Sequence, residues 1–178
     1  MYDLLKELFE GQQLITIYDD ANDNDSFYVG KIVALTNQAV IILIATKEGF
    51  VTGYYYTQLV NIVKITYDGK YENKIKLLCM INSSDFSNSF LFEGELLQSI
   101  LLIAKTNGFI VTLCNTQEDL FHTGLVLDVK TDIIKIQEID NYAQMDGISI
   151  IQSGYITKVT INGLYERALS NMLAYKEN

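Results

Sequence analysis

The sequence predicts a mainly β protein with short helices (α+β class), built as two tandem five-stranded small barrels that are each preceded by a helix. The first observation is a repeat, because residues 30–72 align without a gap with residues 124–166. The second is composition, because Ile, Val, Thr and Tyr dominate the middle of each repeat and favour strands. We therefore predict a first barrel at 1–80, a linker at 81–90, and a second barrel with a C-terminal helix at 91–178.

The repeat carries identical residues as well as a shared apolar phase. Gly30 is matched by Gly124, and the later positions are matched in the same way by pairs such as Gly69/Gly163 and Glu72/Glu166. A fixed period with shared glycines is typical of duplicated structure. A domain of less than half of 178 residues buries a comparatively small fraction of its surface on folding. We therefore expect the two copies to pack on each other.

The first copy begins with a predicted short helix, since Leu4, Leu5 and Leu8–Phe9 recur at helical spacing before Gly11. Period and composition then predict five strands, and a short helix follows the turn at Asp68–Gly69. The predicted strands are Leu14–Tyr18, Phe27–Leu35, Val40–Thr46, Tyr54–Leu59 and Ile62–Tyr67.

The second copy opens with a predicted helix at Leu91–Thr106, which ends at Asn107–Gly108 because both residues tolerate the left-handed conformation. A final helix is predicted at Leu164–Lys176. The predicted strands between them are Phe109–Cys114, Leu120–Val129, Ile133–Ile139, Ile148–Gln152 and Tyr155–Ile161. Five short strands that bend at a glycine such as Gly30 or Gly124 are expected to close into a barrel, which removes exposed edges.

This layout of a helix and five bent strands resembles the Sm-like fold of the Sm, LSm and Hfq proteins. Val29–Leu35 and Thr123–Val129 resemble the family's glycine-containing second strand. Tyr56–Ile65 and Ile150–Val159 resemble its final pair of strands. The resemblance implies Sm-like small barrels, and other SH3-like barrels would give nearly the same pattern.

The family's RNA-binding signature is not matched. Thr36 and Lys130 stand near the position where the family places an acidic residue. The last turn holds Leu59-Val60 in the first copy and Ser153-Gly154 in the second, where the family has a basic residue. The resemblance therefore extends to the fold and not to the RNA chemistry.

Charge and cysteine usage restrict the classes of partner. The formal net charge is −9, and Arg167 is the single arginine, so RNA is disfavoured as a partner and DNA is not expected. No apolar run is long enough to span a membrane, so we expect no membrane partner. Cys79 and Cys114 lie far apart without ligand-like spacing, which favours reduced thiols and a cytoplasmic location.

Candidate chemistry is sparse. The acidic turn Asp19–Asp25 is interpreted as a hairpin loop, because a calcium loop of the EF-hand type would need a glycine where Asp25 stands and a glutamate where Lys31 stands. His122, the only histidine, aligns with Tyr28 and is expected to be an ordinary strand residue. We predict no catalytic residue, no metal site and no cofactor, and hence a protein that is not an enzyme.

The most distinctive local feature is the run Tyr54, Tyr55 and Tyr56. One interpretation places these tyrosines in half-buried strand positions. The other is an interaction surface, since tyrosine is enriched at protein interfaces. We predict a non-enzymatic binding or scaffold protein that acts through contacts with an unknown protein partner or through self-association. The alternative is an RNA-binding Sm-like protein.

Overall fold

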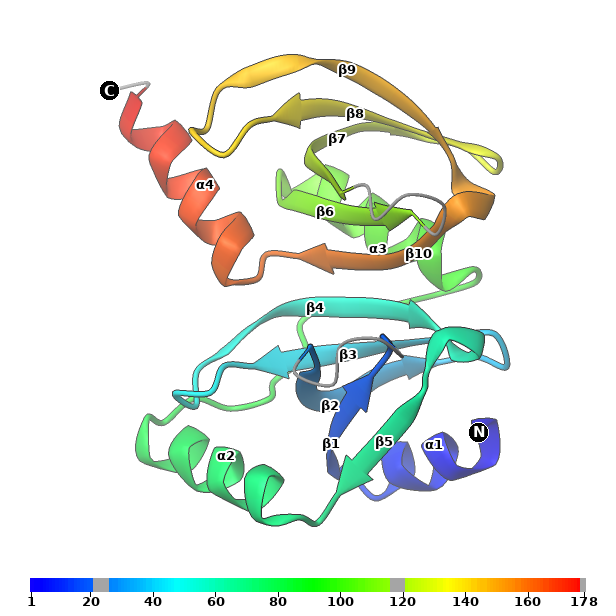
Figure 1. Ribbon diagram of the computed structural model, residues 1–178, viewed down its shortest axis with the longest axis vertical. Coiled ribbons are helices and arrows are strands. Elements are labelled where there is room, and N and C mark those ends of the chain that lie inside the picture. The colour runs from blue at the N-terminus through cyan, green and yellow to red at the C-terminus, as the bar shows by residue number, and fades with distance from the viewer. Residues whose placement is uncertain (21–25, 116–120, 177–178) are drawn as a thin grey trace. The chain divides into compact units, whose positions relative to one another are not determined.

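The computed structural model describes residues 1–20, 26–115 and 121–176 of the chain. The chain divides into two compact units, Met1–Leu91 and Phe92–Asn178. Each unit contains a helix, five antiparallel strands and a trailing helix (Figure 1). The protein is therefore mainly β with four α-helices in its described part, as the sequence predicts.

The elements of the first unit are α1 (Tyr2–Glu10), β1 (Leu14–Tyr18), β2 (Tyr28–Leu35), β3 (Ala39–Ala45), β4 (Val51–Gln58), the 3₁₀ turn η1 (Leu59–Asn61), β5 (Lys64–Tyr67) and α2 (Lys70–Ile81). The elements of the second unit are α3 (Leu96–Asn107), β6 (Ile110–Asn115), β7 (Phe121–Val129), β8 (Ile133–Ile139), β9 (Met145–Gln152), the 3₁₀ turn η2 (Ser153–Tyr155), β10 (Ile156–Ile161) and α4 (Leu164–Lys176).

The strands follow the same order in both units. The order is β5-β1-β2-β3-β4 in the first unit and β10-β6-β7-β8-β9 in the second. The helices also pack in equivalent places, α1 on β2 and α2 on β1, α3 on β7 and α4 on β6. The two units therefore share strand order and helix packing, and their origin by duplication stays a prediction.

The predicted closed barrels are not confirmed. Among the described residues, no strand pairing joins β4 to β5 or β9 to β10, the two ends of each order. The chain passes between these end strands through η1 and η2, which are short 3₁₀ turns and not strands. The resemblance to the Sm-like fold stays a prediction.

Each unit has a glycine on its second strand where the backbone of the neighbouring strand comes very close. A Cβ atom placed on Gly30 would lie 2.3 Å from the carbonyl oxygen of Leu43, and one on Gly124 would lie 2.0 Å from that of Gln137. Both glycines face the neighbouring strand at the same register, Gly30 opposite Ile44 and Gly124 opposite Glu138. The backbones approach too closely for any side chain, which explains why the repeat keeps glycine here.

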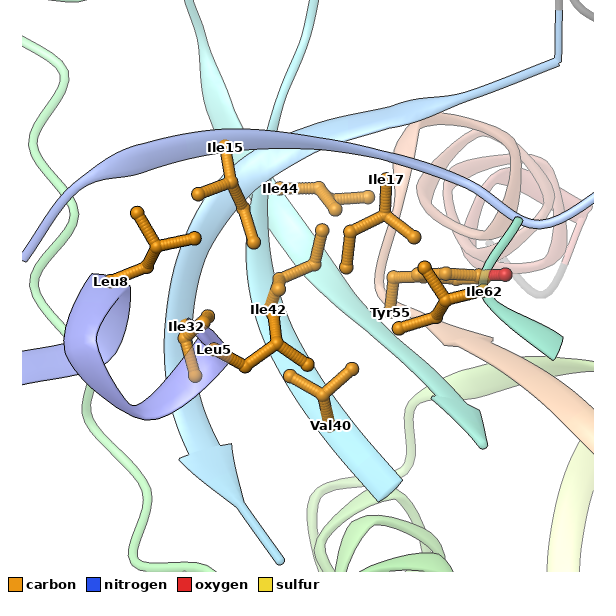
Figure 2. Packing of buried hydrophobic residues seen from close by; sticks show 10 residues of the cluster. All are labelled: Leu5, Leu8, Ile15, Ile17, Ile32, Val40, Ile42, Ile44, Tyr55 and Ile62. Atoms are coloured by element: carbon orange, nitrogen blue, oxygen red, sulfur yellow. The ribbon is translucent and has the colours of Figure 1, made fainter. Parts of the chain in front are cut away.

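The core of the first unit fills the space between α1 and the bent strands. Leu5 and Leu8 of α1 point toward Ile15, Ile32 and Ile42 of the strands (Figure 2). Tyr55 and Ile62 close the far end of the same cluster. Buried apolar surface of this kind is the dominant favourable contribution to folding.

The helix that opens the second unit begins later than predicted, at Leu96 and not at Leu91. The side chain of Glu95 caps it by accepting hydrogen bonds from the backbone N–H groups of Leu97 (3.3 Å) and Gln98 (2.8 Å). The predicted C-terminal signal is confirmed, because Gly108 adopts the left-handed conformation with φ 65°.

The segment between α2 and α3 has no helix or strand before Glu95. The hydroxyl of Ser84 accepts a 2.8 Å hydrogen bond from the backbone N–H of Val51 on β4. The amide of Asn82 donates a 2.8 Å hydrogen bond to the carbonyl of Glu48. Residues of the predicted linker 81–90 are therefore hydrogen-bonded to the first unit.

Candidate functional site

A buried carboxylate anchors the trailing helix of the first unit. Glu72 is the third residue of α2 and is 4% exposed. Its Oε1 accepts hydrogen bonds from the hydroxyl of Thr16 on β1 (2.5 Å) and from that of Thr66 on β5 (2.7 Å). Since Thr16 and Thr66 are directly opposite in the β1–β5 pairing, one carboxylate joins two strands to one helix.

The environment of Glu72 favours its ionised form. Burial alone raises the pKa of this carboxyl, but hydrogen bonds from Thr16, from Thr66 and from the backbone N–H groups of Glu72 and Gly69 lower it further than burial raises it. The net result is a lowered pKa. A side chain that reaches back to the N–H of the residue before the helix is half of a capping box.

The second unit repeats this anchor. Glu166, 3% exposed, is the third residue of α4, and its Oε1 accepts a 2.6 Å hydrogen bond from the hydroxyl of Thr112 on β6. Thr112 lies opposite Thr160 on β10, as Thr16 lies opposite Thr66. Among the described residues, the partners of these two carboxylates are strand threonines and backbone N–H groups, so we assign the two anchors a structural role.

The three sequence-predicted tyrosines lie on β4 and are buried, with exposed fractions of 5% for Tyr54, 1% for Tyr55 and 2% for Tyr56. The ring of Tyr55 stacks on that of Tyr28 with centroids 3.8 Å apart, and its hydroxyl donates to Asp19. The interaction surface on these residues stays a prediction.

The other sequence candidates are placed as follows. His122 lies on β7, where its Nδ1 is 2.8 Å from Oε1 of Glu138 on β8. Cys79 is buried and burial raises the pKa of its thiol, while Cys114 is half-buried, and no disulfide joins the two. The acidic turn falls partly outside the described residues, from 21 to 25. In the described part of the chain, no three His, Cys, Asp or Glu side chains gather as metal ligands would.

The first unit contains a half-open cavity of about 390 Å³ beside α2. Leu14 and Cys79 contribute apolar walls, and Lys31 places its Nζ 5.5 Å from the centre of the Phe86 ring. The lining carries both signs of charge. It includes two basic residues, Lys31 and Lys76, and three acidic ones, Asp68, Glu72 and Asp85. Because acidic and basic side chains are mixed, the lining favours neither an anionic nor a cationic ligand, and we assign the cavity no ligand.

One surface feature of the second unit is a strand with exposed apolar side chains. Met145, Ile148 and Ile150 of β9 are 52%, 56% and 66% exposed, and we call these three residues the β9 edge. β9 stands at the end of its strand order and pairs with β8. The sequence alignment of the two halves matches Ile148 and Ile150 with Tyr54 and Tyr56, so the aligned strands differ in exposure. Sequence reasoning missed this edge because exposure depends on packing.

Comparisons with known proteins give little. No protein-family model matches the chain, and no curated protein matches it significantly. A solved structure that matches is described as YcgR in complex with c-di-GMP from Escherichia coli. The match has 8% sequence identity and covers 98% of this chain and 88% of that one, with a TM-score of 0.18. A TM-score this low carries no argument about fold or function.

Within the described residues, no helix is both long and apolar enough to cross a bilayer.

Proposed function

We propose that this chain is a non-enzymatic binding protein that acts through protein–protein contacts, with the β9 edge as its contact surface. The observation that carries the proposal is the exposure of Ile148 and Ile150 on a strand at the end of its strand order. Edge strands of soluble proteins are commonly protected by charges, proline or a covering element, because an open apolar edge invites pairing.

The chemistry of the β9 edge fits an added strand from a partner. An edge strand offers backbone N–H and C=O groups on its free side, and an extended segment can pair with them while its alternate side chains contact Ile148 and Ile150. Asp140 and Asp146 flank these residues on the β8–β9 hairpin, and Asp146 is exposed. A partner segment with alternating apolar residues and a flanking lysine or arginine therefore complements this surface.

The test is selection of extended peptides of this composition from a display library against the whole protein. The affinity of a selected peptide is then measured by fluorescence anisotropy for wild type and for the variants Ile148→Lys and Ile150→Lys. A lysine on the β9 edge would place a charge inside the contact with the peptide. Each variant is therefore expected to bind the peptide about tenfold more weakly, which corresponds to ~1.4 kcal/mol. Hydrogen exchange of residues 145–152 should slow in the complex with wild type.

The matched control is Val60→Lys, which places the same charge on an apolar residue that is 84% exposed in the first unit. This variant should bind the peptide like wild type. Failure to select any binder, or equal affinity for wild type and Ile150→Lys, would overturn the proposal. If light scattering finds that wild type is a dimer and Ile150→Lys a monomer, the occupant of the edge is a second copy of the chain. The RNA-binding alternative stays a prediction without a supporting observation.

A further inference from the structure

We propose that a half-open cavity of the second unit binds an organic cation that carries an ammonium or guanidinium group. The cavity has a volume of about 500 Å³, which is within the range of small-molecule sites. The residues that define its chemistry are Thr112, Phe121, Thr123, Glu138, Asn141 and Tyr165. None of these residues belongs to the β9 edge, and the proposal does not rest on the function proposed for that edge.

The hydroxyl groups of the cavity point their lone pairs, and not their hydrogens, at a ligand. Thr112 has one hydroxyl hydrogen, and it is donated to the buried carboxylate of Glu166 at 2.6 Å. In the 3.3 Å contact between Thr112 and Thr123, Thr123 must therefore be the donor. The hydrogen of Thr123 is thus also used, and its oxygen is left as an acceptor toward the cavity.

The charged group of the cavity is also an acceptor. Oε1 of Glu138 is 2.8 Å from Nδ1 of His122, while Oε2 has no hydrogen-bond partner among the described residues. Among the described residues, the lining includes no lysine or arginine side chain that would neutralise this carboxylate. A carboxylate beside threonine acceptors suits a ligand that brings several N–H donors and a positive charge.

Two further groups fit the same ligand class. Phe121 and Tyr165 are among the lining residues, and aromatic rings attract ammonium and guanidinium groups. The Oδ1 of Asn141 accepts the hydroxyl hydrogen of Tyr165 at 2.7 Å, which leaves the amide N–H groups of Asn141 for an acceptor elsewhere on the ligand. The net charge of −9 adds a long-range attraction for cations.

The first unit shows what the same fold looks like without this chemistry. Val29 stands where the second unit has Thr123, and Ile44 where it has Glu138. The ring of Phe27 contacts that of Tyr71 edge-on at 5.4 Å, and these residues align with Phe121 and Tyr165. The polar lining of the cavity therefore belongs to the second copy and is no requirement of the fold.

Agmatine, which carries one guanidinium and one ammonium group, is the first probe, and calorimetry with the whole protein measures its affinity. A peptide with acetyl-Gly-Arg-Gly-amide chemistry is the second, because a free amine and an arginine side chain of a protein partner present the same group. Tighter binding of agmatine assigns the site to a free small molecule. Tighter binding of the peptide assigns it to a partner side chain.

The variants use residues that the fold already accommodates in the first unit. Thr123→Val and Glu138→Ile each introduce the residue that stands at the aligned position of the first unit. The double variant should show no measurable binding of agmatine. Glu138→Gln removes the charge with little change in shape and should weaken agmatine by about tenfold or more. Glu93→Gln changes the net charge equally at an exposed site of the same unit and should leave the affinity unchanged.

His122 supplies a readout that does not depend on any variant. It is the single histidine, so its imidazole protons give one resolvable set of NMR signals, and its partner is Glu138. Binding of agmatine at Glu138 should shift these signals in wild type with the same affinity that calorimetry gives. The proposal is overturned if millimolar agmatine and the arginine peptide leave the His122 signals unmoved, or if Glu138→Gln binds as tightly as wild type.

Discussion

Thr16 and Glu72 are separated by 56 positions in the chain, and the hydroxyl of Thr16 donates a 2.5 Å hydrogen bond to the carboxylate of Glu72. This bond fixes the start of α2 against β1, and the 2.7 Å bond from Thr66 fixes it against β5. The hydrogen bond from Thr112 to Glu166 holds α4 in the equivalent place. The position of each trailing helix therefore depends on a buried polar contact as well as on apolar packing.

Replacement of Glu72 by glutamine is expected to destabilise the protein by about 2 kcal/mol, the scale of hydrogen bonds to a charged group. The carboxylate accepts from two hydroxyl groups and from backbone N–H groups, so the amide of Gln would turn N–H donors toward other donors. Urea denaturation followed by circular dichroism measures the loss. The exposed Glu10→Gln variant is the control and should change stability by less than about 0.5 kcal/mol. Equal midpoints for the two variants would contradict the anchor.

The anchor also predicts a pH dependence of stability. The pKa of Glu72 is lowered from its usual 4.5 in the folded protein, so the stabilising contribution is complete above the unfolded value. It is lost as the pH falls through the lower, folded pKa. Urea midpoints of wild type should therefore fall below pH 4.5 more steeply than those of Glu72→Gln. Parallel curves for the two proteins would show that Glu72 does not carry this part of the acid sensitivity.

Substitution of Gly30 by alanine should cost about 3 kcal/mol or more, because the new Cβ would overlap backbone that cannot move aside without disrupting the strands. The nearest atom would be the carbonyl oxygen of Leu43 at 2.3 Å. Gly154→Ala is the control, since no heavy atom lies within 4 Å of a Cβ there, and it should be nearly neutral. Thermal unfolding measures both. A Gly30→Ala protein that melts with wild type would refute the close approach.

Much of the local structure follows from the sequence. β1 spans Leu14–Tyr18 as predicted, because its apolar run is bounded by turn residues. The turn residues Asp68 and Asn162 adopt φ 56° and 53°, where Asp and Asn are enriched. Strand closure was not confirmed, since it depends on long-range pairing between strands that periodicity does not report.

The functional features were harder to predict. The repeat matches Glu72 with Glu166 at identical positions, but Thr16 corresponds to Thr112 at a different spacing, so the alignment did not reveal the anchor. The sequence does not single out Glu138 as a site residue, because its role depends on His122 and Thr123, which the strand pairing brings near it. Conversely, Tyr54 to Tyr56 were conspicuous in the sequence and proved to be buried.

The contacts at Gly30 and Gly124 bear on how distant relatives of this chain could be found. A position that excludes every Cβ atom can only retain glycine, whatever else changes around it during divergence. The strands and helices between the two glycines tolerate few insertions, so the spacing between the glycines changes mainly through insertions in loops. A search for two such glycines, each followed by a Gly-x-x-Glu helix start, could therefore recover relatives whose overall sequence identity is too low to align.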